Sequence, residues 1–457
     1  MPEYGEVARG DVKESFFRGL HEFAGAESFV FEGESFDYTQ LAREVESWAR
    51  YLEGQGVTAG TVTALEGKCS PHSCAALLAL IRLDAIVVPL GPLPEEKRRE
   101  FLGVAEVESV VRADGSGASG VEHTGVRAGH ELFGRLRAAG HPGLVLFSSG
   151  TTGRSKASVL DFVKALNRYG APAKARRILS FLSLDHIGGI NTLLHTLSQG
   201  GTVITVPERT PNAVFGAVER HRAEILPTTP TFLNMALISG ALERYDCSSL
   251  ELVTYGTEPM PIQTLRRLSA ALPAGTRLKQ TYGLSELGIL PTRSKSDDTL
   301  WVRIGGAGFE HKIVDDVLWI RSDMAMLGYL NAPAPFDSEG YFNTQDVVRD
   351  DGDYLHILGR RSEIINVGGE KVYPSEVEGV VLEAGNIADV TVSGLPSPVT
   401  GAAVKATVRL VTDEDPATVS RRVRKHCRGR LEMYKVPVTV EVSQAVQHSE
   451  RFKKVRA

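Results

Sequence analysis

Cysteine is scarce in this sequence, and the few cysteines present match no disulfide or zinc pattern. The four residues are Cys69, Cys74, Cys247 and Cys427. They contain no C-x-x-C pair, and no histidines accompany them at the spacing typical of zinc ligands. We therefore interpret all four as ordinary thiols of a protein in a reducing compartment.

An excess of positive charge and a long hydrophobic run are also missing. Lys and Arg number 51 against 56 Asp and Glu, a formal net charge of -5, which argues against a nucleic-acid partner bound through overall positive charge. The most apolar stretch, residues 74–90, is interrupted by Arg82, Asp84 and Pro89, so it predicts a buried helix and a buried strand instead of a membrane span. The acidic start has no apolar segment behind it, which predicts no signal peptide and a cytoplasmic location.

What the sequence does have is the length and composition of a multidomain globular protein. With 457 residues, 42% hydrophobic and 23% charged, the chain exceeds one ordinary core, so we expect two or more domains. Short apolar runs alternate with helical segments, which favours an α/β fold of layered sheets and helices with much parallel sheet. The runs expected as strands are residues 85–90, 143–147, 178–182, 202–206 and 250–255.

Two helices are predicted together with their ends. Residues 39–52 repeat apolar side chains at the helical period, with Thr39 as N-cap and Gly54 as the stop signal. A second helix opens at Pro374, a residue favoured in a first helical turn, and keeps its spacing until Gly385.

The clearest domain boundary lies near residue 359, after a polar turn at residues 350–353. We expect a large N-terminal domain of residues 1–358. Residues 359–363 are the predicted hinge. Residues 364–457 suffice for a small, mobile α+β domain.

A run of small and hydroxyl residues follows the strand predicted at residues 143–147. It reads Ser148, Ser149, Gly150, Thr151, Thr152, Gly153, Arg154, Ser155 and Lys156. Such residues let backbone N–H groups approach an anion closely, and the lysine adds positive charge, although similar clusters after strands are usually plain loops. A Walker loop needs a second glycine directly before its lysine. Because Ser155 stands there, the standard P-loop NTPase class is excluded.

Together with the motifs below, this run resembles the signature loop of the adenylate-forming superfamily, which includes acyl- and aryl-CoA ligases, firefly luciferase and the adenylation domains of nonribosomal peptide synthetases. The family pattern is Ser/Thr-Ser-Gly-Thr-Thr-Gly-x-Pro-Lys-Gly. This chain matches through Gly153 and at Lys156, and departs at Ser155 and Ala157. The resemblance covers nearly the whole chain and implies the two-domain fold of that family, with the loop and its lysine holding the phosphates of ATP.

A second segment, Tyr282-Gly283-Leu284-Ser285-Glu286, resembles the family's Tyr-Gly-x-Thr-Glu. The resemblance implies that Tyr282 stacks on adenine, Ser285 contacts the α-phosphate and Glu286 holds Mg²⁺. An aromatic face suits a purine, and Mg²⁺ prefers carboxylate and phosphate oxygens. Alone, a Tyr-Gly turn beside a glutamate is more often structural, so these roles depend on the ordered series of motifs.

Two more segments resemble motifs around the nucleotide. Gly256, Thr257 and Glu258 correspond to part of the family's Gly-Gly-x-Pro-Leu turn beside the adenine and acyl pocket. Asp346 corresponds to the Thr-Gly-Asp carboxylate, which in the family takes the ribose hydroxyls, and Gln345 replaces the customary glycine.

Around the predicted hinge, the resemblance implies one binding residue and one passage. Arg360 would bind ribose or phosphate, and Glu363 occupies the position of the usual hinge residue. Gly368 and Gly369 belong to the segment that lines the thiol tunnel after domain rotation, where glycine leaves room for a pantetheine arm.

Near the C-terminus the family places a Gly-Lys whose lysine bridges the substrate carboxylate and ATP. The resemblance puts Lys453 on this catalytic lysine, with Phe452 in place of the glycine and Lys454 as the close rival. A lysine suits the neutralisation of charge at the α-phosphate, whereas a basic tail is more often a solvated end.

The resemblance also places the acid pocket. His186 stands where the family often has a histidine at the mouth between nucleotide and acyl group, and residues 227–232 would form the other wall. A basic cluster near the end of the chain is a solvated helix face or, as the less favoured alternative, a docking patch for CoA phosphates or an acidic carrier protein. Its members are Arg421, Arg422, Arg424, Lys425, Arg428 and Arg430.

The expected activity has two half-reactions. A small-molecule carboxylic acid attacks the α-phosphate of Mg·ATP to give an acyl-adenylate and pyrophosphate, and a thiol then takes the acyl group after domain rotation. Coenzyme A is the preferred thiol. The alternatives are the phosphopantetheine of an acyl carrier protein, an amine or nitrite-type acceptor and, from another class, a non-catalytic nucleotide-binding regulator.

Overall fold

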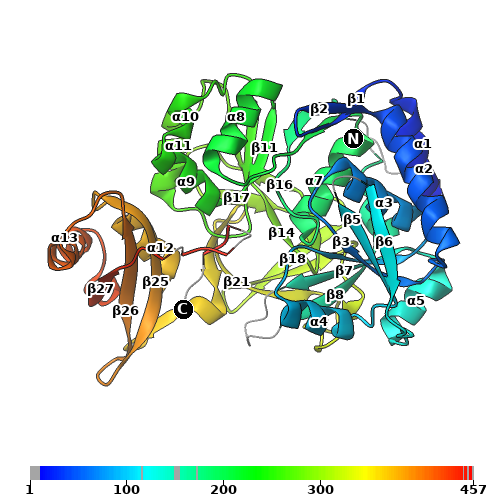
Figure 1. Cartoon of the computed structure of the whole chain (residues 1–457). Coiled ribbons are helices and arrows are strands. Elements are labelled where there is room, and N and C mark those ends of the chain that lie inside the picture. The colour runs from blue at the N-terminus through cyan, green and yellow to red at the C-terminus, as the bar shows by residue number, and fades with distance from the viewer. Residues whose placement is uncertain are drawn as a thin grey trace.

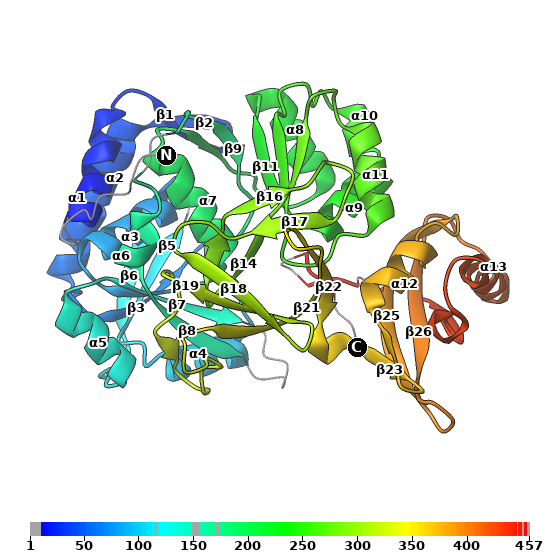
Figure 2. The ribbon, with the colours of Figure 1, turned by 180° about the vertical axis from the view of Figure 1, so that it is seen from behind.

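The computed structural model describes residues 11–114, 117–148, 155–170, 173–445, 447–449 and 452–454. They form a large body of three main sheets with helices between and around them, and a smaller lobe at one side that contains α12, α13, β25 and β26 (Figure 1). The view from behind shows the same division (Figure 2). The predicted α/β class, with a large N-terminal and a small α+β C-terminal domain, is confirmed.

The first seven-stranded sheet carries the edge on which the candidate site is built. Its order is β13-β12-β11-β9-β10-β1-β2, and every neighbouring pair except β1 with β2 is parallel. In that order the strands are Arg277–Gln280, Leu252–Tyr255, Ile225–Thr228, Arg177–Leu179, Thr202–Ile204, Glu27–Phe31 and Glu34–Asp37. The carboxyl ends of six neighbouring strands therefore meet along one edge.

The second seven-stranded sheet, of order β20-β8-β7-β4-β3-β5-β6, mixes parallel and antiparallel pairs. Its strands are, in the same order, Gly328–Tyr329, Lys156–Asp161, Gly143–Ser148, Ile86–Leu90, Val62–Glu66, Ser109–Asp114 and Gly117–His123. Strands β7 and β8 lie on either side of the predicted phosphate loop, and the short β20 brings Tyr329 next to them.

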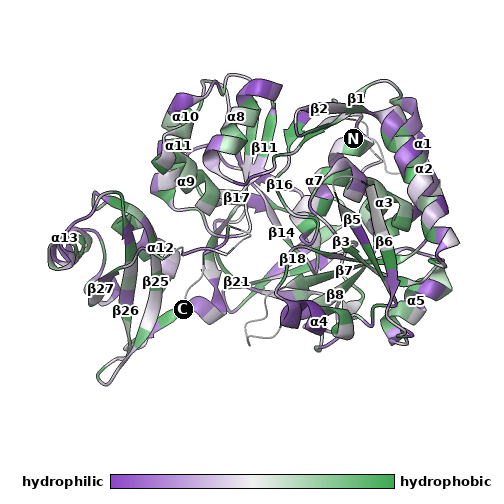
Figure 3. Cartoon of the chain, viewed as in Figure 1, coloured by the Kyte–Doolittle hydropathy of each residue, from purple (hydrophilic) through white to green (hydrophobic). Residues whose placement is uncertain are grey.

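Helices cover the sheets with their apolar faces. In the N-terminal domain they are α1 (Asp11–Glu22), α2 (Tyr38–Gly54), α3 (Pro71–Arg82), α4 (Glu95–Val104), α5 (Glu131–Ala139), α6 (Phe162–Asn167), α7 (Ile187–Ser198), α8 (Pro211–His221), α9 (Pro230–Ser239), α10 (Ala241–Arg244) and α11 (Ile262–Ala271). The solvent side of α4 is strongly hydrophilic, whereas much of the strand surface is hydrophobic (Figure 3). Such patterning is what burial of one helix face requires.

A third sheet and a hairpin follow. The hairpin pairs β14 (Tyr282–Leu284) with β15 (Gly288–Leu290). The sheet is antiparallel, of order β16-β17-β22-β21-β19-β18. Its strands are Thr292–Ser294, Trp301–Ile304, Leu355–Arg360, Phe342–Asp350, Val317–Ser322 and Phe309–Val314. Sequence analysis did not foresee this antiparallel layer.

The C-terminal lobe has its own apolar core around one sheet. The sheet runs β24-β23-β26-β25 with β27 beside β26. Its strands are Glu370–Val372, Ile365–Val367, Gly401–Leu410, Ile387–Ser397 and Thr439–Val442; the helices are α12 (Pro374–Val381) and α13 (Pro416–Arg428), with 3-10 turns η1 (Arg361–Glu363) and η2 (Met433–Lys435). The predicted hinge thus falls between β22 of one domain and β23 of the other, and its function as a hinge stays a prediction.

Local predictions differ from the structure mainly at the ends of elements. The cap of α2 is Asp37, not Thr39, because the Asp37 side chain and Gln40 form a reciprocal capping box. The strand expected to reach residue 182 ends at Leu179, and the helix that opens at Pro374 ends at Val381. Among the described residues, no helix combines the length and apolar character that a membrane span requires.

Candidate active site

A pocket opens at the carboxyl ends of the parallel strands. Phe181 follows β9, Arg209 follows β10, Thr228 ends β11, Gly256 follows β12 and Thr281 follows β13, and all five line the same pocket. Ligands of α/β proteins bind at this edge because the strand ends leave loops with free polar groups there. The predicted pocket wall at residues 227–232 is partly present, since Pro227, Thr228 and Thr229 line it.

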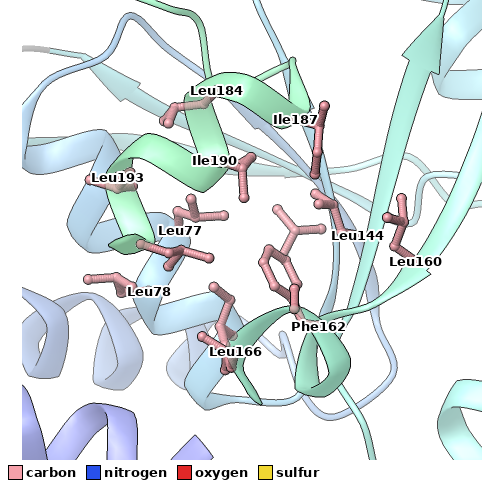
Figure 4. Packing of buried hydrophobic residues seen from close by; sticks show 14 of the residues in the cluster. Leu77, Leu78, Leu144, Leu160, Phe162, Leu166, Leu184, Ile187, Ile190 and Leu193 are labelled. Atoms are coloured by element: carbon pink, nitrogen blue, oxygen red, sulfur yellow. The ribbon is translucent and has the colours of Figure 1, made fainter. Parts of the chain in front are cut away.

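His186 also lines this pocket and caps α7. Its Nδ1 accepts a hydrogen bond of 3.0 Å from the backbone N–H of Gly188. The first turns of α7 are fixed by burial of Ile187 and Ile190 in the core between α3, α6 and β7 (Figure 4). The structure therefore brings His186 to the pocket, as predicted, and its contact with a substrate stays a prediction.

Tyr282, Asp346 and Arg360 form a polar group in which Tyr282 and Asp346 are buried and Arg360 is partly exposed. The Tyr282 hydroxyl donates to Asp346 Oδ2 at 2.5 Å, and Arg360 Nε lies 3.5 Å from Asp346 Oδ1. Burial raises the pKa of Asp346, and the Arg360 charge and the tyrosine hydrogen bond oppose this rise. The three residues from distant motifs are thus brought together, and their contact with a nucleotide stays a prediction.

A second group gathers at the ends of the predicted phosphate loop. Glu286 is buried, and its Oε1 accepts hydrogen bonds from Tyr329 at 2.8 Å and from Ser148 at 3.5 Å. Lys156 Nζ lies 5.2 Å from the centre of the Tyr329 ring. Ser149, Gly150, Thr151, Thr152 and Gly153 lie outside the described residues.

The donor set near Glu286 fits a magnesium ion that is bound mainly by phosphate and water. Mg²⁺ commonly uses only one or two protein carboxylates, and among the described residues no three His, Cys, Asp or Glu side chains cluster as a metal cage. Sequence analysis missed Tyr329. No motif marks it, because its place beside Glu286 results from the pairing of β20 with β8.

Glu258 holds backbone groups in this structure. Its Oε1 accepts from the Thr231 N–H at 2.7 Å and its Oε2 from the Lys454 N–H at 3.0 Å. Burial raises its pKa, although these hydrogen bonds oppose the rise. Gly256 and Thr257 line the pocket, whereas Glu258 connects the start of α9 to the C-terminal tail.

The C-terminal tail, residues 452–454, enters between the two domains. Phe452 is buried, with its ring 5.2 Å from that of Phe232 and 6.0 Å from that of Phe181, centre to centre. Its carbonyl accepts a hydrogen bond of 3.0 Å from the Thr229 hydroxyl. The phenylalanine that replaces the family's glycine therefore anchors the tail to the N-terminal domain.

Lys453 and Lys454, the two candidates for the catalytic lysine, lie in different environments. Lys454 Nζ donates to the Val390 carbonyl at 2.5 Å and lies 3.5 Å from Asp389 and 3.6 Å from Glu378, all in the C-terminal domain. Lys453, in contrast, lines the pocket together with His186. Lys454 is thus held in a buried ion-pair group of the C-terminal domain, whereas Lys453 lines the pocket, and which of the two meets the substrate stays a prediction.

Three departures from the family motifs share one backbone property. Thr257, Gln345 and Phe452 have φ of 73°, 63° and 51°, and each stands where the family pattern has glycine. This left-handed region costs a residue with a side chain on the order of 1 kcal/mol. These three residues therefore keep the backbone conformation that glycine adopts freely, and contacts with their neighbours must offset its cost.

Other predicted residues do not reach this pocket. Gly368 and Gly369, with φ of 60° and 95°, form the turn between β23 and β24, and neither lines the pocket. Ser285 and Gly283 lie in the β14–β15 hairpin, where a side chain on Gly283 would meet Ile289 and the Gly288 carbonyl oxygen at 2.7 Å. Roles for Gly368, Gly369 and Ser285 stay predictions.

The basic cluster lies on and just after α13, away from the pocket. Some of its charges are paired within the C-terminal domain, since Arg422 contacts Glu414, and Arg430 Nε lies 3.4 Å from Glu383. This supports the solvated, structural interpretation of these residues over a docking patch.

Comparison with known proteins decides the family. A model described as "AMP-binding enzyme" matches residues 16–330, and one described as "AMP-binding enzyme C-terminal domain" matches residues 376–453. The chain belongs to the AMP-binding enzyme family. The resemblance inferred from the motifs is thereby confirmed.

Relatives within the family extend over almost all of the chain. An indoleacetate–CoA ligase of Aromatoleum aromaticum is 28% identical over 91% of each chain, and a feruloyl-CoA synthase of an Amycolatopsis species is 29% identical over 90% of each. The crystal structure of the anthranilate–CoA ligase AuaEII superposes with a TM-score of 0.82 at 18% identity, covering 98% of this chain and 97% of that one. The predicted fold and the predicted class, an AMP-forming ligase, are confirmed.

Phe452→Gly tests the anchoring of the tail. The change relieves the strained φ but removes a buried aromatic contact, a loss of about 3 kcal/mol or more for such truncations. We expect adenylation to slow about 10- to 100-fold, measured by ATP–pyrophosphate exchange. Phe452→Leu, which keeps apolar volume, should retain most of the rate; unchanged exchange in Phe452→Gly would contradict the anchoring role.

Asp346→Asn tests the adenosine site and its pH dependence. A carboxylate accepts two ribose hydroxyls better than an amide does, so ATP affinity should fall about 10- to 100-fold. Because the pKa of Asp346 is raised, affinity of the unsubstituted protein should decline as pH falls through that raised pKa, and the variant should lack this decline. Titration calorimetry at several pH values measures both.

The raised pKa of Asp346 affects folding stability in the opposite direction to ATP affinity: stability should fall as pH rises. A carboxyl whose pKa is raised on folding contributes stability below its unfolded pKa and loses it as pH rises through its folded pKa. The unfolding free energy of the unsubstituted protein relative to Asp346→Asn should therefore fall across that window. A difference that grows with pH would show that burial does not dominate at Asp346.

Proposed function

We propose that this protein activates a small carboxylic acid as an acyl-adenylate with Mg·ATP and then transfers the acyl group to the thiol of coenzyme A. The observation that carries the proposal is the position of Lys453, which lines one pocket with His186 at the carboxyl edge of the parallel sheet. The group of Tyr282, Asp346 and Arg360 would bind the adenosine part of ATP, which their mutual contacts support.

In the first half-reaction, a carboxylate oxygen of the acid attacks the α-phosphorus of ATP, and the bond from that phosphorus to the bridging oxygen of pyrophosphate breaks. Lys453 would neutralise charge shared by the carboxylate and the α-phosphate. Asp346 would accept the ribose hydroxyls, and Lys156 and Ser148 would bind phosphate oxygens. A Mg²⁺ held by Glu286 would add positive charge beside the phosphates.

In the second half-reaction the thiolate attacks the acyl carbon and AMP leaves. The C-terminal domain would rotate about residues 359–363 and bring the Gly368–Gly369 turn toward the pocket. Because Lys454 ties the tail to its own domain, Lys453 would leave the pocket with that domain. The rotation would break the Phe452 anchor and the hydrogen bond of 3.0 Å from Asn234 Nδ2 to the Ala388 carbonyl.

Coenzyme A is preferred as acceptor because an indoleacetate–CoA ligase and a feruloyl-CoA synthase, each similar over about nine-tenths of this chain, use it by name. A carrier-protein phosphopantetheine is the second candidate, since a fatty acid–acyl-carrier-protein ligase of Mycobacterium marinum is 27% identical over 92% of this chain. The placement of this protein in the cytoplasm, with ATP and CoA at hand, is part of the same proposal.

Pyrophosphate release with a panel of carboxylic acids tests the proposal. We expect acid-dependent release, followed by a thioester when CoA is added. If ATP binds but no acid gives any turnover, the proposal that the protein is an enzyme is wrong. If acyl-AMP accumulates with CoA and only a carrier protein accepts the acyl group, the proposal of CoA as acceptor is wrong.

The pair Lys453→Ala and Lys454→Ala tests the assignment of the lysine. Lys453→Ala should lower adenylation at least about 100-fold, as expected for loss of charge neutralisation, yet leave thiolation of preformed acyl-AMP intact. Lys454→Ala should destabilise the tail and slow adenylation less. Loss of adenylation in Lys454→Ala alone would reverse the assignment.

A further inference from the structure

The order of the strands distinguishes a nucleotide end of the pocket from an acid end. The adenosine motifs follow β12 and β13 at one edge of the parallel sheet, whereas β10 lies beyond β11 and β9 on the other side. Lys453 is fixed over β11, because its neighbour Phe452 is bonded to Thr229 at the end of that strand. An acid held by Lys453 therefore extends away from the nucleotide, toward β10.

Arg209 lies at the end of the pocket next to β10. It is half-buried on the connection from β10 to α8 and lines the pocket. Among the described residues, no hydrogen bond or ion pair holds its guanidinium. The charged side chains that line the pocket are Lys453 and Arg209, with no carboxylate among the described lining residues. The first cation serves the reacting carboxylate and phosphate, and the second has no partner of opposite charge.

A second observation also points to a polar ligand. Thr228 is 5% exposed and lines the pocket, and its buried hydroxyl has no hydrogen-bond partner among the described residues. A buried polar group without a partner costs on the order of 1–3 kcal/mol. Ser183, Asn191 and Thr192 add further polar groups to the same wall. A pocket for a plain hydrocarbon chain would not be lined in this way.

We infer that the activated acid carries a second anionic group, a carboxylate, which pairs with Arg209. A guanidinium binds a carboxylate with two parallel hydrogen bonds, which makes arginine suited to this task. Two strand spacings separate β11 from β10, about 10 Å in all, so the two carboxyl groups lie at opposite ends of an extended molecule. This inference rests on the proposed function and adds the chemical class of its substrate.

The test compares acids and variants in one pyrophosphate-release assay. Linear dicarboxylic acids from succinic to sebacic acid are set against monocarboxylic acids of equal chain length and against ω-amino acids. The variants are Arg209→Gln, Arg209→Glu and, as matched control, Arg220→Gln, which removes the same charge from the exposed face of α8.

The unsubstituted protein should prefer a dicarboxylic acid to its monocarboxylic counterpart, and Arg209→Gln should lower kcat/KM for the dicarboxylic acid about 10- to 100-fold. The monocarboxylic acid should change little. Arg209→Glu should shift the preference toward the ω-amino acid, since the charge at the far end is reversed. Arg220→Gln should behave as the unsubstituted protein.

Other outcomes separate the two proposals. Equal use of mono- and dicarboxylic acids overturns the inference about Arg209 and leaves the adenylation reaction standing. An equal loss for all acids in Arg209→Gln, with weaker ATP binding by calorimetry, also overturns it, because Arg209 would then serve the nucleotide. No release with any acid overturns the proposed function itself.

Discussion

The site depends on a short C-terminal tail that is held by both domains at once. Phe452 is buried against Phe181 and Phe232 of the large domain, while Lys454 is buried among carboxylates of the small one. Lys453 lies between these two anchored residues and lines the pocket. Because Phe452 is held by one domain and Lys454 by the other, the relative position of the two domains determines where the Lys453 ammonium group lies, and this is the group that we propose for adenylation.

The rest of the site follows from the parallel sheet. Its carboxyl edge supplies the loops that line the pocket, in the order of the strands, and the proposed nucleotide and acid sites are neighbouring stretches of that edge. The antiparallel layer adds Asp346 and Arg360 from paired strands, at positions directly opposite each other. Residues from distant parts of the sequence therefore come together through strand order in one sheet and strand pairing in another.

The domain order and the parallel sheet could be predicted from the sequence. The ordered series of motifs also singled out Tyr282, Asp346 and Arg360, which the structure brings together, and their roles stay predictions. Sequence reasoning could not foresee Tyr329 or Arg209, which reach the site through strand pairing and strand order. It treated Phe452 as a departure from a pattern, and only packing shows the ring as an anchor. The antiparallel layer was missed since short alternating strands carry a weak local signal.

The central claim is that this arrangement of the domains performs adenylation and must be left for thiol transfer. Asn234 and Ala388 face each other across the two domains, so cysteines placed at both positions and joined by a short bis-maleimide would lock the arrangement. Mass spectrometry of the locked protein with ATP, Mg²⁺, an accepted acid and CoA then gives a direct answer. The account predicts acyl-adenylate without thioester, with each single-cysteine variant treated identically forming both; thioester from the locked protein at the normal rate, or no adenylate at all, would contradict it.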